Sequence, residues 1–241
     1  GQIQVVDHQE IFRNYQQYLP TFNSLSIESM LWNIKGISNH FIYLNDDFFF
    51  NQQSDLSDFL IDGQMVIYGH WQATLIKKMK YIFRKFLQQN FGMVAEAKYS
   101  TAQMLSADRV GMTRYYEIHH RPHILSRDLL STFFKNNKEL LDQQIQFKFR
   151  NIDQLLPVGL SNHLAIQSDQ AILKDDIDIA YLKDGRDLEK FILALSNSEI
   201  KFGCIQSLDQ LESLAEGRIR AALIQKFTGF LPSQIQPTTV V

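Results

Sequence analysis

Two adjacent carboxylates and an asparagine interrupt an apolar, aromatic run of the chain. The run covers residues 40–50, and Asn45, Asp46 and Asp47 stand in its middle, directly before Phe48. Oxygen ligands at the end of an apolar strand commonly bind a divalent metal and the phosphates that it carries. The same three residues also suit an ordinary polar turn. The triplet alone leaves both interpretations open.

Histidines form a second cluster. His119, His120 and His123 lie within five positions, although the chain has only seven histidines. Pro122 prevents a regular helix through this span, so the spacing is weak evidence for zinc. One neutral imidazole could serve as a general base or acid near pH 7. The alternative is a set of polar loop histidines with no chemical task.

Arg150 lies between Phe149 and Asn151 and could clamp a phosphate, because a guanidinium presents a planar fork of donors. A surface arginine at a helix end is the alternative. Gly92 and Gly111 lie in no GxGxxG or GxxxxGK pattern, so nucleotide binding of the Rossmann or P-loop kind is not supported. The absence of GxSxG argues equally against a serine hydrolase.

Composition bounds the class of protein. The chain has 241 residues, 45% of them hydrophobic, which is enough for one sizeable domain. With 24 basic and 26 acidic residues, its net charge of −2 gives no bulk field for nucleic acid or an anionic membrane. Cys204 is the single cysteine, which excludes an internal disulfide and fits a reducing compartment. These features favour a soluble, bacterial cytoplasmic protein.

The elements that must position the triplet can be read from the first fifty residues. Residues 3–6 read as a short buried strand. Asn23 or Ser24 would cap a helix whose apolar spacing continues to Gly36. A further strand then delivers the acids. Strand, helix and strand form a parallel βαβ unit, in which ligands bind at the carboxyl ends of the strands.

The rest of the chain predicts a helix-rich middle. Asp62-Gly63 predicts a hairpin turn. Residues 71–90 predict an amphipathic helix with an apolar stripe and a basic face, which could meet an anionic polymer or a membrane, although such a face is more often merely solvated. Further helices are expected at 99–108, 124–146, 187–197 and 208–229, with a strand at 200–205. We therefore predict a single α/β domain around a mostly parallel central sheet, with a helical insertion from about residue 71 to 146.

A family resemblance covers much of this pattern. Residues 19–24, 27–28, 36–38 and 41–49 closely resemble the second signature block of the Stealth family. That family contains bacterial capsular polysaccharide phosphotransferases and the catalytic subunit of the lysosomal-enzyme N-acetylglucosamine-1-phosphotransferase. Two later blocks are more diffuse: residues 120–123 and 149–151 are similar to the third, and residues 202–205 and 230–233 to the fourth.

The chain also departs from the family pattern. Gln206 and Ser207 stand where the family usually has Asn-Asp, with Asp209 two residues later. The family's first block, which is expected upstream, is missing. We therefore expect an N-terminally incomplete catalytic domain at residues 1–230, which can be inactive by itself, followed by a polar tail at 231–241.

The resemblance implies a reaction. A sugar 1-phosphate, in this case N-acetylhexosamine 1-phosphate, passes from a UDP-sugar to a polysaccharide hydroxyl, and UMP is released, in capsule or cell-surface polysaccharide synthesis. Asp46 and Asp47 would bind Mg²⁺ or Mn²⁺ at the diphosphate, with Asp46 catalytic and Asn45 orienting the donor. His120 would be the base and Arg150 the phosphate clamp.

The remaining substrate contacts are of lower rank. Asn23, Ser24 and Glu28 would line the sugar or nucleotide side, although Asn23 or Ser24 could serve only as a helix cap. His123 is a second-rank candidate for substrate binding.

Two other functions compete with this interpretation. A GT-A-like glycosyltransferase also holds a metal-bound nucleotide between paired acids, but its acceptor attacks the anomeric carbon and UDP leaves. A non-catalytic glycan-binding or assembly module is the second alternative. In each enzymatic case the expected partners are a UDP-sugar donor and a polysaccharide acceptor, without nucleic acid. The expected location is the bacterial cytoplasm, at the inner face of the membrane where capsule is assembled.

Overall fold

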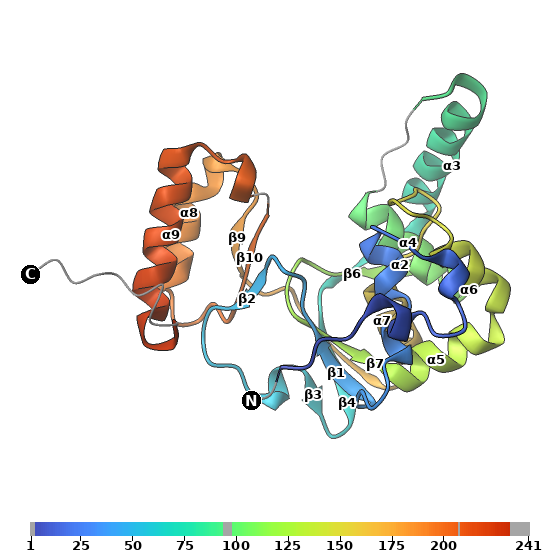
Figure 1. The fold of residues 1–241 in the computed structure, drawn as a ribbon, viewed down its shortest axis with the longest axis horizontal. Helices are drawn as coiled ribbons and strands as arrows, with labels where there is room; N and C mark the ends of the chain where they lie inside the picture. Colours follow the sequence, from blue (N-terminus) through green and yellow to red (C-terminus); the bar gives the residue numbers. More distant parts are fainter. Residues whose placement is uncertain (1–2, 94–97, 207, 232–241) are drawn as a thin grey trace, which may run out of the picture. The chain divides into compact units, whose positions relative to one another are not determined.

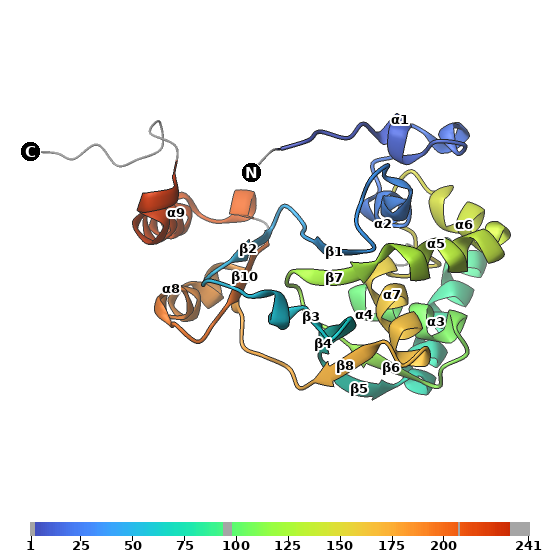
Figure 2. The same cartoon turned by 90° about the horizontal axis from the view of Figure 1, so that it is seen from below.

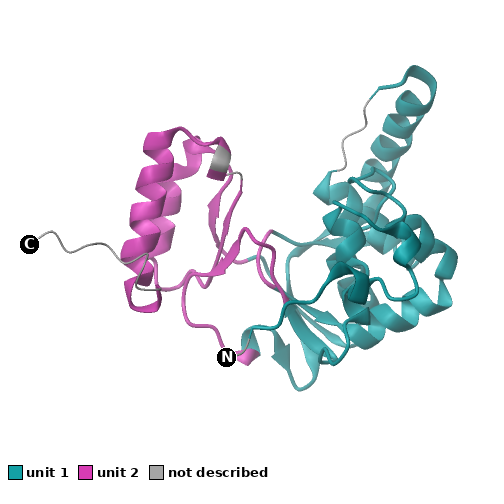
Figure 3. Cartoon of the chain, viewed as in Figure 1, with its two compact units in different colours: residues 1–42, 57–119, 123–176 teal, residues 43–56, 120–122, 177–241 magenta. Residues whose placement is uncertain are grey.

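The computed structural model describes residues 3–93, 98–206 and 208–231, which form two compact units (Figure 3). Unit 1 comprises residues 1–42, 57–119 and 123–176, and unit 2 comprises residues 43–56, 120–122 and 177–241. Each unit combines helices with short strands. The predicted α/β class is therefore confirmed. The predicted tail lies outside the described residues from residue 232 onward.

Unit 1 contains most of the helices that the structure describes (Figure 1). These helices are α1 His8–Ile11, α2 Ser24–Glu28, α3 Thr74–Phe91, α4 Tyr99–Arg109, α5 Arg127–Asn136, α6 Lys138–Ile145 and α7 Pro157–Gln167. Its strands are β1 His40–Tyr43, whose last residue begins unit 2, β3 Leu60–Ile61, β4 Gln64–Tyr68, β5 His70–Ala73, β6 Arg114–Glu117, β7 His123–Ser126 and β8 Ala171–Lys174. They pair as β1-β7, β3-β4-β8 and β5-β6, and Figure 2 shows β3, β4 and β8 beside one another.

Helix α7 lies at the buried centre of unit 1. Residues 157–163 are all buried, and Pro157 starts the helix, where its missing N–H leaves no bond unmade. His163 accepts a hydrogen bond through Nε2 from the backbone N–H of Tyr116 in β6, at 2.9 Å. Its Nδ1–H donates to the Gly159 carbonyl at 2.6 Å. The neutral imidazole therefore joins α7 to β6 inside the core.

Unit 2 is built on one three-stranded sheet. Its strands are β2 Phe48–Phe50, β9 Ala180–Leu182 and β10 Phe202–Ile205, and its helices are α8 Leu188–Ser196 and α9 Ser213–Phe227. The middle strand, β10, runs parallel to β9 and antiparallel to β2. The core between the sheet and the helices consists of buried apolar residues: Ala180, Leu182, Leu188, Phe191, Leu195, Ile200 and Ile219.

One glycine fixes the register between β2 and β10. Gly203 is the register partner of Phe49. A Cβ atom at residue 203 would come within 2.1 Å of the Phe49 ring, far closer than van der Waals contact. The ring packs in turn edge to face against Phe191 of α8, with ring centroids 6.4 Å apart. Only glycine therefore allows this ring to cover the strand.

The predicted mostly parallel central sheet is not what the described strands form. They form four small sheets, in which β4-β8 and β9-β10 are parallel and β3-β4, β5-β6 and β2-β10 are antiparallel. The opening βαβ prediction was wrong because residues 3–6 have no partner strand in the described chain. The side chains of Ile3 and Val5 are 96% and 91% exposed. A single strand without a partner leaves its backbone groups unpaired and does not persist in water.

Two predicted elements differ from the observed ones. Helix α2 ends at Glu28 instead of near Gly36, because the chain continues in tighter i→i+3 bonds: the Met30 N–H donates to the Ile27 carbonyl at 2.9 Å, and a 3-10 turn follows at Leu31–Asn33. The segment at 71–146 is not a purely helical insertion. It includes β6 and β7 and most of β5, and β7 pairs with β1, which lies before this segment in the sequence.

Other local predictions are confirmed. The hairpin turns at Asp62-Gly63, both with positive φ (51° and 80°), as the right-handed twist of the flanking strands requires. Helices α4 and α8 and strand β10 lie where they were predicted. The long predictions at 124–146 and 208–229 are each shorter in the structure: the first begins as β7 and breaks at Asn137, and the second begins as a 3-10 turn before α9.

Helix α3 is amphipathic as predicted, but its faces are reversed. Lys77, Lys78 and Lys85 lie against the body of unit 1 and pair with Glu117, Asp108 and Asp153, respectively. The apolar stripe faces outward instead, with each side chain more than half exposed: Leu75, Ile76, Met79, Ile82, Phe83 and Phe86. Among the described residues, no helix has the length and apolarity needed to cross a membrane.

The environment of His163 predicts a pH dependence of stability. Burial lowers the pKa of His163 to about 4 from the ordinary value of 6.5. Between these values the unfolded chain binds a proton that the folded chain does not. The stabilising contribution is therefore complete above pH 6.5 and is lost as the pH falls toward 4, by about 3 kcal/mol.

Urea unfolding at pH 7 and at pH 4.5 checks this expectation. His163→Gln should show a smaller drop in the free energy of unfolding between the two pH values than the unchanged chain. His8→Gln, at an exposed position of α1, should keep the full drop. Equal drops in all three chains would contradict the assignment.

Candidate functional site

Three chain segments meet at one edge of the unit 2 sheet. Strands β9 and β10 are parallel and both end at this edge, and β2 is antiparallel to β10 and begins there. Cys204 pairs with Phe48, which places Asp47 opposite Ile205, and the Ile205 N–H donates to the Asp47 carbonyl at 2.9 Å. The Asn45-Asp46-Asp47 triplet thus lies where two parallel strands end, although not in the large sheet that was predicted. We call this edge the strand-end site.

Asp47 is the less exposed acid of the pair. Its Oδ2 accepts a hydrogen bond from the thiol of Cys204 at 3.4 Å. Its Oδ1 is buried and has no hydrogen-bond partner among the described residues. Burial, together with the neighbouring Asp47 charge, raises the pKa of Cys204 far above its usual value. The thiol is therefore a neutral donor to Asp47 and a poor nucleophile.

The other two members of the triplet differ. Asp46 is exposed, and Asn45 is half-buried with its Oδ1 bound by the Tyr43 hydroxyl. That contact leaves the Asn45 amide nitrogen as the group that could meet a ligand.

His120 lies between two aromatic rings in unit 2. It stacks on Tyr181 of β9, with ring planes 7° apart and centroids separated by 6.3 Å. The Phe48 ring is tilted against it at the same centroid distance. The imidazole is therefore held beside the first residue of β2, which directly follows Asp47 in the chain.

Tyr181 and Gln206 extend the strand-end site. The Tyr181 hydroxyl donates to Gln206 Oε1 at 2.7 Å. Burial, followed by the charges of nearby groups that include Asp47, raises the pKa of Tyr181 to about 12, so the phenol remains protonated. Gln206 occupies the position where the resemblance had led us to expect an asparagine. Ser207 lies outside the described residues.

A pocket of about 750 Å³ opens at this edge. It is lined by residues that follow the two parallel strands: Lys183, Asp184, Gly185 and Arg186 after β9, and Gln206, Gln210, Leu211, Glu212 and Ala215 after β10. Arg186 bonds Asp184 at 2.7 Å and lowers the pKa of that carboxyl to about 2. Lys183 has no ion-pair partner in the described part of the chain, so it can meet an anionic ligand.

The donor set suits a hard divalent cation. Mg²⁺ and Mn²⁺ favour oxygen ligands, and a buried carboxylate oxygen without a hydrogen bond is costly unless a ligand occupies it. Asp47 Oδ1 is such an atom, and the adjacent exposed Asp46 offers a second carboxylate. The residues present therefore fit the predicted metal.

The other predicted residues belong to unit 1. Asn23 is fully buried and caps α2: its Oδ1 accepts from the Leu25 N–H at 3.2 Å, and its Nδ2 donates to Gln154 at 2.9 Å and to the Phe147 carbonyl at 3.1 Å. Both the oxygen and the nitrogen of the Asn23 amide are therefore used in structural hydrogen bonds. This is the helix-cap alternative named for Asn23 above.

Ser24 and Arg150 do come together. The Arg150 guanidinium donates to Ser24 Oγ at 2.9 Å and is otherwise exposed. Beside them, Phe22 and Phe149 stack with ring centroids 5.8 Å apart, although the two side chains are 71% and 70% exposed. We call these four residues the aromatic-arginine patch. An exposed stacked pair next to a guanidinium can bind a planar or sugar ring that carries phosphate.

Glu28 and His123 are buried, at 7% and 4% exposure. His123 Nε2 bonds the His119 carbonyl at 3.0 Å, which fixes the loop between β6 and β7. Both residues shape unit 1 from the inside.

Tyr181, Gln206 and Phe22 were missed as site residues by sequence reasoning. Tyr181 lies on a three-residue strand, too short to show alternation. Phe22 and Phe149 are far apart in sequence, and each by itself reads as an ordinary core residue. The backbone bond from the Phe22 N–H to the Lys148 carbonyl, at 3.0 Å, brings their loops together.

Comparison of the sequence with known proteins identifies a conserved region and several relatives. Residues 1–67 match Stealth protein CR2, conserved region 2. An exopolysaccharide phosphotransferase of Streptomyces coelicolor is 30% identical over 190 residues, covering 74% of this chain and 29% of the relative. The capsular polysaccharide phosphotransferase SacB of Neisseria meningitidis serogroup A is 28% identical over 180 residues, covering 72% and 30%. Another exopolysaccharide phosphotransferase of S. coelicolor is 26% identical over 216 residues, covering 88% and 34%.

The chain thus carries a Stealth conserved region and resembles phosphotransferases of bacterial polysaccharides along most of its length. It belongs to the Stealth family. The chain spans about a third or less of the length of these relatives.

Cys204 reports on the charge at Asp47. Asp47→Asn removes the neighbouring negative charge and should speed alkylation of the chain's single thiol by iodoacetamide at pH 8 about threefold or more, because it lowers the thiol pKa. The rate of labelling can be followed by mass spectrometry.

Asp46→Asn is the matched control, since it removes the same charge from an exposed neighbour. Its labelling rate should stay close to that of the unchanged chain. If both variants speed labelling equally, Asp47 has no special contact with the thiol.

Proposed function

We propose that the protein transfers a sugar 1-phosphate from a UDP-sugar, with UDP-N-acetylhexosamine as the donor, to a hydroxyl of a capsular or cell-surface polysaccharide. The strand-end site carries this proposal: it combines a buried carboxylate oxygen, an acid beside it and a histidine between aromatic rings, next to a pocket that contains Lys183. Within the described residues, neither that oxygen nor the lysine has a bonding partner. The names of the relatives, which are polysaccharide phosphotransferases, support the same chemistry. We further propose that residues 1–230 all belong to the catalytic region.

The proposed reaction is a displacement at phosphorus. The acceptor oxygen forms a bond to the sugar-linked phosphorus, the bond from that phosphorus to the bridging oxygen breaks, and UMP leaves. His120 accepts the proton of the acceptor hydroxyl as general base. Its stacking on Tyr181 restricts the ring to one plane, so the attacking hydroxyl meets a base of fixed orientation.

Charge on the diphosphate must be balanced during this step. Asp47 and Asp46 would hold Mg²⁺ or Mn²⁺, which supplies positive charge to the diphosphate when bound. Lys183 supplies a further cation from the pocket wall. The Asn45 amide is placed to orient the donor, because its carbonyl oxygen is already bound by Tyr43.

The aromatic-arginine patch is proposed as a substrate-binding surface of unit 1 in its own right. Arg150 would bind a phosphate oxygen of a ligand on this surface, while Phe22 and Phe149 contact its planar or sugar ring. Ser24 holds the guanidinium in place. Glu28 and His123 are proposed to support the same region from inside unit 1.

The leaving group separates this function from its main alternative. Incubation with UDP-N-acetylhexosamine, Mg²⁺ and a hydroxyl-bearing polysaccharide should release UMP, which ion-exchange chromatography resolves from UDP. His120→Ala should reduce UMP release at least about 100-fold, a typical loss for a general base. Asp47→Asn should reduce it by about the same factor, because it removes a proposed ligand of the metal that balances the diphosphate charge. His8→Ala, at an exposed position, should retain full release.

Three outcomes would contradict the proposal. Release of UDP would indicate a glycosyltransferase. Saturable donor and glycan binding without turnover would indicate a non-catalytic module. Full activity in Asp47→Asn and His120→Ala would show that the strand-end site does not perform the reaction.

We also propose that helix α3 lies on an anionic membrane surface. Its outward stripe includes Met79, Phe83 and Phe86, which are 63%, 60% and 51% exposed. On the same helix, Lys80 and Arg84 have no acidic partner in the described part of the chain. Exposed apolar side chains with unpaired cations on one helix favour the interface of an anionic bilayer.

Co-sedimentation with vesicles tests this proposal. The chain should bind vesicles of phosphatidylglycerol and phosphatidylcholine, and Phe83→Ser with Phe86→Ser should weaken binding at least about fivefold. Leu193→Ser, which removes a 73% exposed leucine from α8, is the control and should bind normally. If the double variant instead abolishes self-association and vesicles never bind, the stripe contacts a second copy of the chain.

A further inference from the structure

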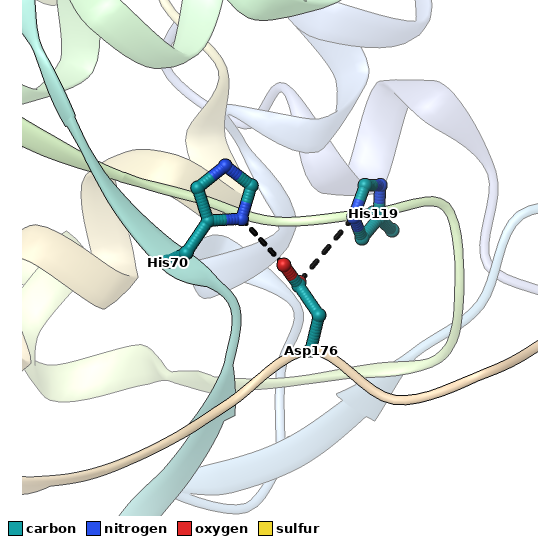
Figure 4. Close-up of side chains that lie close together, drawn as sticks. All are labelled: His70, His119 and Asp176. Carbon is teal, nitrogen blue, oxygen red and sulfur yellow. Dashed lines mark hydrogen bonds and ion pairs between the residues drawn. The ribbon is translucent and has the colours of Figure 1, made fainter.

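Unit 1 contains a cluster of metal-ligating side chains that the proposed transfer reaction does not use. His70, His119 and Asp176 each offer one ligand atom, and these atoms all lie within 4.8 Å of one another. Asp176 is at the centre: its Oδ2 contacts His70 Nδ1, and its Oδ1 lies 3.3 Å from His119 Nε2 (Figure 4). The residues are separated by at least 49 positions in sequence, so only the fold brings them together.

The backbone holds His70 close to β6. His70 is the register partner of Glu117 in the β5-β6 pair. The preceding residue, Gly69, passes so near the Glu117 carbonyl oxygen that a Cβ atom there would lie 2.2 Å from it. Glycine at position 69 therefore permits the approach that places the His70 ring over the end of β6.

Independent hydrogen bonds fix the other two ligands. The Gln103 side chain, which is buried in α4, accepts from the Ile118 N–H at 2.8 Å and donates to the Ile118 carbonyl at 3.1 Å, directly before His119. The Lys174 carbonyl, two residues before Asp176, accepts from the Gly69 N–H at 2.9 Å and from the Tyr116 hydroxyl at 2.8 Å. All three segments are thus positioned by pairing or hydrogen bonds to their backbone, separate from the contacts between the ligands themselves.

The second nitrogen of His70 also has a carboxylate nearby. His70 Nε2 lies 3.7 Å from Glu117 Oε2. The Glu117 carboxylate is fixed by Lys77 at 3.2 Å and by the Tyr115 hydroxyl at 3.1 Å. A histidine that presents one nitrogen to a metal and the other to a carboxylate is the usual arrangement around zinc, because the carboxylate orients the ring and makes it more basic.

We propose that His70 Nδ1, His119 Nε2 and Asp176 bind a divalent first-row transition metal of the Zn²⁺ class. Two imidazoles with one carboxylate favour such ions over Mg²⁺ and Ca²⁺, which prefer oxygen alone. Ligand atoms of a tetrahedral zinc site are about 3.3 Å apart, given Zn–N bonds of about 2.0–2.1 Å. The contact from His119 to Asp176 already has this length, and the two imidazoles are 41% and 53% exposed, so an ion can reach them from solvent.

Three protein ligands leave one tetrahedral position for water or an external ligand. The site would therefore be open. The competing explanation is a metal-free ion pair, in which protonated histidines bind Asp176. A metal site would take up one metal ion per chain, whereas the ion pair would take up none.

Titration with Zn²⁺ alone tests the proposal. The 241-residue chain, stripped with a chelator, should bind one Zn²⁺ with a Kd of about 10 μM or tighter by isothermal titration calorimetry. His119→Ala and Asp176→Asn should each weaken binding at least about tenfold, the lower end of the loss that even outer-shell changes produce. His8→Ala, at an exposed position outside the cluster, should bind like the unchanged chain.

Two results would overturn the inference: no saturable zinc binding by the unchanged chain, or equal affinity in His119→Ala and His8→Ala. Circular dichroism of every variant confirms folding, and His119 is the preferred position because its side chain is 53% exposed and its removal leaves the core intact. Cobalt gives a second readout, since bound Co²⁺ should show visible absorption that His119→Ala lacks. Neither measurement requires turnover, so the result is independent of whether the sugar-phosphate transfer is confirmed.

Discussion

The close packing of the Phe49 ring over Gly203 is the constraint on which the strand-end site depends. Because no other residue fits under this ring, β2 and β10 pair in one register. A shift by one residue would turn Asp47 to the opposite face of the sheet. It would also separate its carboxylate from the Cys204 thiol. A packing contact inside the core therefore decides which way the acid points and leaves one of its oxygens buried, with no hydrogen bond from any residue that the structure describes.

The two units place polar groups by the same physical means. In each, a chemically active side chain lies next to a short strand, and a hydrogen bond to the nearby backbone holds its segment in place. Asp47 is set by the Ile205 N–H, and His119 by the Gln103 amide on Ile118. Strands of three or four residues are too short to be rigid alone. The bonds at their ends compensate for this shortness.

Sequence reasoning predicted the local backbone conformation well and the assembly of distant segments poorly. The triplet at the end of a strand, the Asp62-Gly63 turn and the Asn23 cap all depend on neighbours a few residues away, and local propensity is sufficient for them. The sheet prediction was wrong because apolar runs at residues 3–6 and 40–50 do not reveal their partners. Tyr181 beside His120, and His70 beside Asp176, are set by contacts between distant segments. No spacing along the chain encodes these pairs.

Helix α3 contacts unit 1 through its lysines and turns its apolar stripe outward, which changes the kind of interaction that attaches it. A helix that buries its apolar stripe is attached by contacts that added salt strengthens or leaves unchanged. Helix α3 instead meets unit 1 largely through lysine-carboxylate pairs that remain partly open to water. Such pairs weaken as ionic strength rises and the Debye length falls below about 10 Å. Added salt should therefore weaken the contacts of α3 with unit 1 more than those of the buried helix α7.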